Sequence, residues 1–190
     1  MKINVELNSK SIKDAVRILK NQKKVLLDQM IPEYMELAAD WIINRANEIL
    51  DKSDIGENVK SYIFRAWDTK WIGKYHLQII NHSRKSTYVE FGVGIVGQTS
   101  EHPNAQTTNW EYNLDTIHKD VNGAWRFTVY EEDDLDISKN AIIEQFDEKN
   151  KTAIYTMGTQ GVWYLYNAVE DFKVRYQQQL WEKIKKKYWS

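Results

Sequence analysis

Residues 32–52 read PEYMELAADWIINRANEILDK, and this stretch decides how the chain begins to fold. Its apolar residues recur every three or four positions, which is the spacing of one face of an α-helix. They are Tyr34, Leu37, Ala38, Trp41, Ile42, Ala46, Ile49 and Leu50. Pro32 suits the first turn of a helix, where its missing N–H costs no hydrogen bond. The sequence therefore predicts a helix over 32–52, ended by the glycine-containing segment 53–58.

The segment before this helix has the same apolar spacing. Ser11 and Asp14 resemble a capping box, in which side chains bond the free backbone amides at a helix start. The apolar positions behind them are Ile12, Ala15, Val16, Leu19, Leu26 and Met30. We therefore expect helices over about 11–30 and 32–52, or one long kinked helix. The alternating residues 3–7 predict a short strand ahead of them.

The C-terminal segment has the clearest helical pattern in the chain. Its apolar residues step by three or four and are Leu165, Val169, Phe172, Tyr176, Leu180, Ile184 and Tyr188. Four lysines crowd its end, where cations interact favourably with the helix dipole. We interpret the basic and aromatic residues 183–189 as a helix end with solvated lysines rather than as a nucleic-acid site.

Between these helices the apolar pattern changes to period two. It predicts strands over 59–67, 75–80 and 87–91, with a turn over 68–73. A further pair of strands is predicted over 124–130 and 152–158, as the arms of a hairpin. The polar segment 98–123 is expected to be a long loop. The hairpin tip, 131–151, is extended and contains a short helix over 137–146.

This order of helices, strands and helix predicts an α+β fold. We expect a single domain over 1–190, in which an antiparallel sheet has long N-terminal helices and a C-terminal helix packed on one face. The length of 190 residues suits one domain. The long loop 98–123 and the extended hairpin tip 131–151 would be its two elaborations.

Composition excludes several function classes. The chain has no cysteine, which argues against zinc fingers, thiolate nucleophiles and disulfide scaffolds. Its 26 basic and 27 acidic residues nearly cancel, so no global charge attracts it to DNA or to an anionic membrane. No run approaches the ~20 apolar residues of a membrane span. We expect a soluble protein made in the cytoplasm, without membrane partners.

Glycines and histidines offer two candidate cofactor patterns. Gly92-x-Gly94-x-x-Gly97 matches the letters of a dinucleotide-binding turn. The residues that follow, QTSEHP, are typical of a loop, and the flanking βαβ pattern is absent, so we interpret the glycines as a turn. The four histidines, His76, His82, His102 and His118, show no metal-ligand spacing. We expect neither a cofactor nor a metal.

Glu90 is the main candidate for acid–base chemistry, because it stands in an apolar stretch. Burial would raise the pKa of its carboxyl group and suit it to proton transfer. No second carboxylate is signalled as its partner, so we favour a structural or edge-strand glutamate. An enzyme that uses Glu90 near His102 is the least supported hypothesis. The acidic run 131–136 lacks the register of a calcium loop and is interpreted as a solvated hairpin tip.

Aromatic residues are abundant, with 8 Trp and 11 Tyr. We favour a core built from large rings, although protein interfaces and sugar-binding platforms use the same side chains. The alternative function is therefore an aromatic-rich carbohydrate-binding module, which would use the rings of four tryptophans. These are Trp67, Trp71, Trp110 and Trp125.

A longer pattern resembles a known phage family. It begins with residues 88–97, YVEFGVGIVG, continues with His102-Pro103 and Trp110, and ends with Tyr155 and Gly158. It resembles the lambdoid-phage gene-product-ten-like family of head–tail joining, or tail completion, proteins. The residues that match the family motif are Tyr88, Val89, Glu90, Phe91, Gly92, Gly94, Gly97, His102, Pro103, Trp110, Tyr155 and Gly158.

The resemblance implies a structural, non-enzymatic protein of a tailed-phage virion. It would act in the neck or tail, after assembly in the cytoplasm of the bacterial host. Its expected partners are further copies of itself in a ring, with six-fold symmetry the leading expectation. Head-completion proteins and tail-terminator or tail-tube proteins would be its neighbours. The protein would contact nucleic acid only because it lies close to the DNA channel.

Overall fold

A computed structural model describes residues 9–112, 125–130, 142–147, 151–156 and 158–189. The predicted α+β class with long terminal helices is confirmed, and every strand pairing in these residues is antiparallel. The predicted strand over 3–7 lies outside the described residues.

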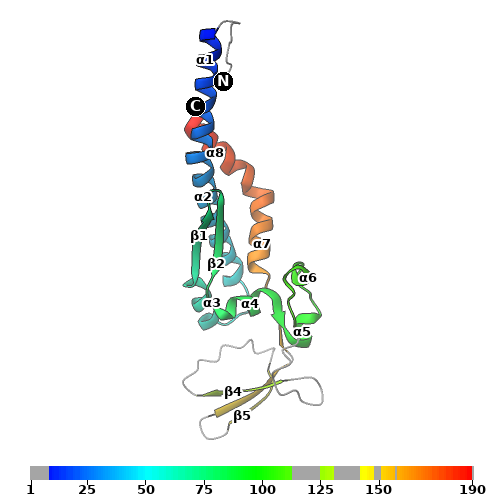
Figure 1. Cartoon of the computed structure of the whole chain (residues 1–190). Helices are drawn as coiled ribbons and strands as arrows, with labels where there is room; N and C mark the ends of the chain where they lie inside the picture. Colours follow the sequence, from blue (N-terminus) through cyan, green and yellow to red (C-terminus); the bar gives the residue numbers. More distant parts are fainter. Residues whose placement is uncertain (1–8, 113–124, 131–141, 148–150, 157, 190) are drawn as a thin grey trace.

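The N-terminal helices form one long rod (Figure 1). Helix α1 (Ser9–Val25) continues through the π-helical turn η1 (Leu26–Met30) into α2 (Ile31–Asp51). This matches the predicted helices, joined as one interrupted helix. Pro32 lies in the first turn of α2, directly after the π-helical turn, and has no backbone N–H to donate to the residues before it. The helix ends where Ser53 Oγ donates a hydrogen bond to the carbonyl of Leu50 at 2.6 Å.

The C-terminal helices run back along this rod, as Figure 1 shows. They are α7 (Tyr164–Asp171), the π-helical turn η3 (Phe172–Tyr176) and α8 (Gln177–Trp189). Two buried clusters join them to the rod, one around Leu50 and Tyr164 and the other around Met30 and Leu180. Burying such side chains contributes roughly 1.5–3 kcal/mol each. Packing therefore holds the two helical arms together.

The prediction for 59–73 is wrong in both of its parts. Helix α3 (Glu57–Phe64) replaces the strand expected over 59–67. A short apolar run fits both the two-residue period of a strand and the 3.6-residue period of a helix. Here the run is helical, and Ile63 of α3 is buried in the cluster around Leu50. Strand β1 (Trp67–Gly73) replaces the turn expected over 68–73 and pairs with β2 (His76–Asn81), which confirms the strand over 75–80.

The strand predicted over 87–91 is also wrong, because helix α4 (Arg84–Phe91) occupies this stretch. Ser83 Oγ caps the helix by accepting from the Lys85 N–H. Glu90 therefore lies on a helix and not on an edge strand. Strand β3 (Gly92–Val93) and helix α5 (Gly94–Gln98) follow. The predicted loop 98–123 contains helix α6 (Ala105–Thr108), and its residues 113–123 lie outside the described part.

The strands predicted over 124–130 and 152–158 are confirmed and pair with each other, but a further strand lies between them in the chain, so they are not the two arms of one hairpin. Strand β4 (Trp125–Tyr130) pairs with β6 (Lys151–Thr156). The short helix expected in the tip is wrong over its described part, because β5 (Ile142–Asp147) is a strand that pairs with the other side of β6. The pairing with β6 gives backbone N–H and C=O groups of β5 their hydrogen-bond partners. The rest of the tip, including the acidic run 131–136, lies outside the described residues.

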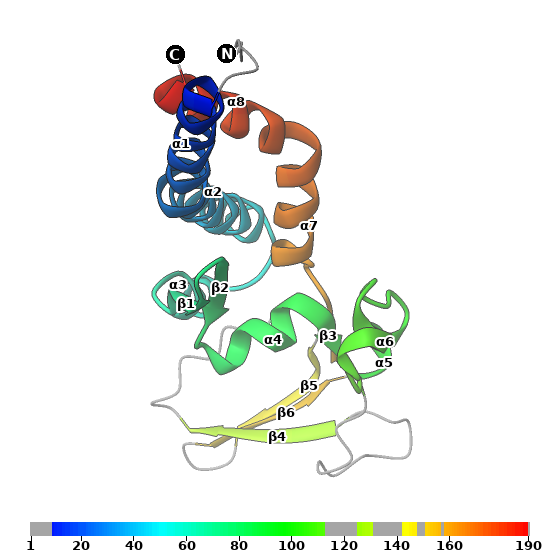
Figure 2. The same ribbon diagram turned by 45° about the horizontal axis from the view of Figure 1, so that its top comes forward.

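In the described residues the strands form three small sheets instead of one continuous sheet. The third consists of β3 and β7 (Gly158–Gln160). Figure 2 shows α4 between the helical arms and the sheet of β4, β5 and β6. Helix α4 and the segment after it therefore sit where the helices and the strands meet, and most of the family-motif residues lie there.

Candidate functional site

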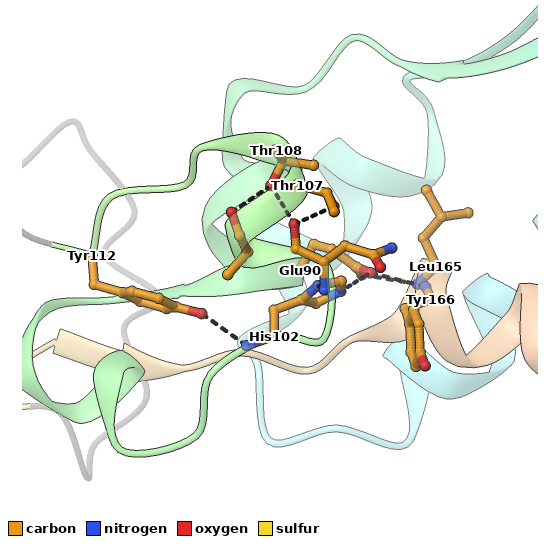
Figure 3. Close-up of polar contacts among 9 residues, drawn as sticks. Glu90, His102, Thr107, Thr108, Tyr112, Leu165 and Tyr166 are labelled. Atoms are coloured by element: carbon orange, nitrogen blue, oxygen red, sulfur yellow. Dashed lines mark hydrogen bonds and ion pairs between the residues drawn. The ribbon is translucent and has the colours of Figure 1, made fainter.

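Glu90 lies in the last turn of α4 and is buried, with 7% of its surface exposed. Its carboxylate accepts two hydrogen bonds from the first turn of α7. The N–H of Leu165 donates to Oε2 at 2.9 Å, and the N–H of Tyr166 donates to Oε1 at 2.9 Å (Figure 3). Amides in a first helical turn have no partner within the helix, and a negative charge there complements the helix dipole. Glu90 thus caps a helix that is distant in the sequence, since Leu165 lies 75 residues after it.

His102 completes this buried contact. Its Nε2 lies 3.0 Å from Glu90 Oε1, and its Nδ1 accepts a hydrogen bond from the N–H of Asn104 at 3.0 Å. Because Nδ1 is an acceptor, the ring proton of the neutral imidazole sits on Nε2, which donates to Glu90. The backbone N–H of His102 donates to Tyr112 Oη at 2.8 Å. One histidine therefore ties the segment 99–112 to α4.

Aromatic rings enclose the imidazole of His102. Phe91 lies 4.3 Å from it between ring centroids, Tyr166 lies at 5.3 Å and Trp163 lies at 5.8 Å. Tyr164, the first residue of α7, is buried in the core cluster around Leu50, and burial raises the pKa of its hydroxyl, which keeps it protonated. We call Glu90, His102, Tyr112, Leu165 and Tyr166 the Glu90 clamp.

The arrangement of the clamp favours a structural role over proton transfer. Both carboxylate oxygens and both ring nitrogens are engaged within the chain, and both side chains are buried. A general base needs a free lone pair within about 3 Å of the proton that it removes. The clamp instead joins three segments that are distant in sequence: α4, 99–112 and the start of α7.

Glycines allow the backbones around the clamp to approach closely. Gly92, Gly94 and Gly158 have positive φ angles of 78°, 68° and 101°. A Cβ on Gly158 would lie 2.0 Å from the carbonyl oxygen of Val93. The N–H of Gly94 donates to the carbonyl of Tyr112 at 2.8 Å. The glycines of the Gly-x-Gly-x-x-Gly run therefore serve backbone geometry, but their interpretation as a turn is wrong, because they lie in β3 and α5.

The structure brings most of the family-motif residues together around the clamp. Trp110 stacks on Phe91 at 5.1 Å, contacts Tyr88 edge-on at 5.9 Å and donates from Nε1 to the carbonyl of Gly92 at 3.1 Å. Val89 belongs to the core cluster around Leu50.

The remaining motif residues occupy different positions. Gly97 is packed so closely that a Cβ there would lie 3.0 Å from the ring of Tyr112. Pro103 is exposed beside His102. Tyr155 lies on β6, opposite Arg126, and its side chain is outside the described part.

Sequence reasoning did not identify the partners that define the clamp. Glu90 and His102 were both candidates, but the amides of Leu165 and Tyr166 are backbone groups and leave no side-chain signal. Trp163 immediately precedes α7 with a left-handed φ of 54°, a conformation that the sequence does not indicate. Tyr112 contributes its hydroxyl group and its carbonyl group.

The four tryptophans of the carbohydrate hypothesis differ in their surroundings. Trp67 donates from Nε1 to Asn47 Oδ1 at 2.8 Å and packs edge-on against Tyr164. Trp110 is engaged around the clamp, whereas Trp71 has 37% of its surface exposed. The side chain of Trp125 lies outside the described residues.

The most exposed apolar side chains of the long rod lie on α1. Ile12, Val16 and Leu19 are 47%, 45% and 55% exposed, and their spacing places them on one helix face. Within the described residues, no helix is long and apolar enough to cross a membrane. No group of three or more His, Asp or Glu side chains there is arranged to hold a metal ion.

Comparison of the chain with models of protein families, with curated proteins and with solved structures gives no match.

Proposed function

We propose that this chain is a structural protein of a tailed-phage virion, a head–tail joining or tail completion protein of the neck. The proposal starts from the resemblance of residues 88–97 and the residues that follow in the motif. The observation that supports it most directly is the Glu90 clamp. In the clamp, Glu90 and His102, the two ionisable residues at its centre, hold three segments of the chain together. A motif with this role stabilises the fold and requires no substrate.

The protein acts by assembly in this proposal. Its partners are copies of itself in a ring, expected to be six-fold, and head-completion, tail-terminator or tail-tube proteins. Helix α1 offers the assembly surface, since Ile12, Val16 and Leu19 form an exposed apolar stripe. Most of the stability of a helix in a protein comes from packing of its apolar face, so a neighbour packed against the exposed stripe would stabilise α1.

The direct test is deletion of the coding sequence from the phage genome that carries it. A neck protein is required to join heads and tails, so the lysate should contain DNA-filled heads and separate tails under the electron microscope. Supplying the protein from a plasmid should restore joined, infectious particles. Normal particles from the deletion phage would refute the proposal.

Two matched double variants test the assembly surface in the same complementation. I12S/L19S removes two exposed apolar groups from α1, whereas I72S/V174S removes two that are also exposed, at 51% and 81%, elsewhere. We expect the α1 variant to fail and the control variant to restore infection. Equal success of both variants would show that assembly uses another surface.

A further inference from the structure

Helix α1 carries a strong local excess of positive charge. Its sequence, SKSIKDAVRILKNQKKV, contains six basic residues and one acidic residue, although the whole chain has a net charge of −1. Lys13, Arg17, Lys20 and Lys24 follow one another at intervals of four, three and four residues. This spacing places all four on one face of the helix. We call these four residues the basic stripe.

The basic stripe is accessible and largely uncompensated. All four of its side chains are exposed. Arg17 pairs with Asp14 at 3.1 Å, and no carboxylate in the described part of the chain pairs with the three lysines. Figure 1 shows α1 extending past the end of α8, so that the helix projects from the molecule. Within the described residues, the charges of the three lysines are therefore left without a paired carboxylate.

The basic and apolar stripes of α1 are separate. At about 100° per residue, the basic stripe is centred roughly 100° around the helix axis from Ile12, Val16 and Leu19. A neighbouring chain that covers the apolar stripe therefore leaves the basic stripe open. Lysine is depleted in the cores of protein–protein interfaces, so a row of lysines suits a different partner.

We propose that α1 binds double-stranded DNA through the basic stripe, by contacts to phosphates and without preference for sequence. The stripe spans about 16 Å of helix, and DNA presents one phosphate charge per ~1.7 Å of its axis. The helix, about 10–12 Å across with its side chains, matches a major groove about 12 Å wide. This inference rests on α1 alone and does not depend on the proposed neck function.

The test measures the fluorescence anisotropy of a labelled random duplex of about 30 base pairs, titrated with the full chain over roughly 50–200 mM salt. With about four phosphate contacts, the logarithm of the binding constant should fall with the logarithm of salt concentration at a slope of about −3 to −4. The variant K13Q/R17Q/K20Q/K24Q should lose at least about tenfold in affinity at the lowest salt, and its slope should flatten.

The matched control, K52Q/R65Q/K70Q/R84Q, removes the same charge from four exposed residues away from α1. It should bind DNA within about twofold of the original chain, since phosphate contacts act locally. Equal losses in both variants would overturn the proposal, because binding would then follow net charge alone. Absence of DNA binding at the lowest salt would overturn it as well.

Two further probes separate DNA from other anionic partners. Polyglutamate stands in for an acidic protein, and vesicles of phosphatidylserine and phosphatidylcholine stand in for an anionic membrane. Tighter binding to either probe than to DNA, lost in the α1 variant, would reassign the basic stripe and overturn the proposal. Light scattering in the same buffers records self-association independently, so a failure of assembly and a failure of DNA binding are distinguishable.

Discussion

Glu90 and His102 form a buried pair in which Oε1 of the carboxylate lies 3.0 Å from Nε2 of the ring. The same carboxylate accepts hydrogen bonds from two backbone amides in the first turn of α7. The same histidine accepts a hydrogen bond from the backbone of Asn104 and donates one from its own backbone to the hydroxyl of Tyr112. The pair therefore couples the end of α4 to the start of the C-terminal helices. Its consequences for stability can be measured directly.

Replacing Glu90 with Ala should lower the free energy of unfolding by roughly 3 kcal/mol or more, because two backbone N–H groups and one ring N–H lose their acceptor in a buried place. Chemical denaturation monitored by tryptophan fluorescence measures this loss. Glu101, which is exposed on the same segment as His102, provides the control, and Glu101→Gln should change stability by less than about 0.5 kcal/mol. Equal stability of the two variants would contradict the clamp.

Replacing Gly158 with Ala should lower the free energy of unfolding by at least about 2 kcal/mol, because its φ of 101° strains any other residue and a Cβ would strike the Val93 carbonyl. Gly73→Ala is the control, since a Cβ there meets its nearest atom at an ordinary 3.7 Å. Thermal unfolding of both variants compares them. A Gly158→Ala protein as stable as Gly73→Ala would show that β3 and β7 do not approach as described.

Replacing Leu180 with Ala should cost about 2–5 kcal/mol, because its side chain is fully buried between α8 and the rod. Val174, 81% exposed on the same arm, should tolerate the change to Ala within about 0.5 kcal/mol. Urea unfolding separates the two cases. Similar small effects at both positions would mean that α8 does not pack on the rod.

The contact between Glu33 and α8 should make stability depend on pH. Hydrogen bonds from Lys187 and then Tyr188 lower the pKa of Glu33 below its ordinary value of 4.5. A lowered folded pKa gives stability that is present above pH 4.5 and is lost as pH falls through the folded pKa. The difference in melting temperature between the original chain and Glu33→Gln should therefore shrink below pH 4.5. A constant difference down to pH 2 would contradict this contact.

The long helices could be predicted from sequence because their apolar spacing is sustained over many turns. The stretches 59–67 and 87–91 could not, because in such short runs the alternation of a strand and the spacing of a single helical turn overlap. Tertiary packing decides these cases, through Ile63 in the core and Glu90 at the start of α7. At the candidate site, Glu90 and His102 were identifiable as residues, but their function as a clamp depends on backbone amides that no sequence pattern marks.

The mass of the full-length chain in solution, measured by light scattering over a range of concentrations, tests the central claim most directly. That claim is that the protein works by assembling with itself through α1. It predicts a ring-sized species of several times 22.5 kDa, which I12S/L19S converts to monomer and I72S/V174S leaves intact. A 22.5 kDa monomer at every concentration would contradict the claim.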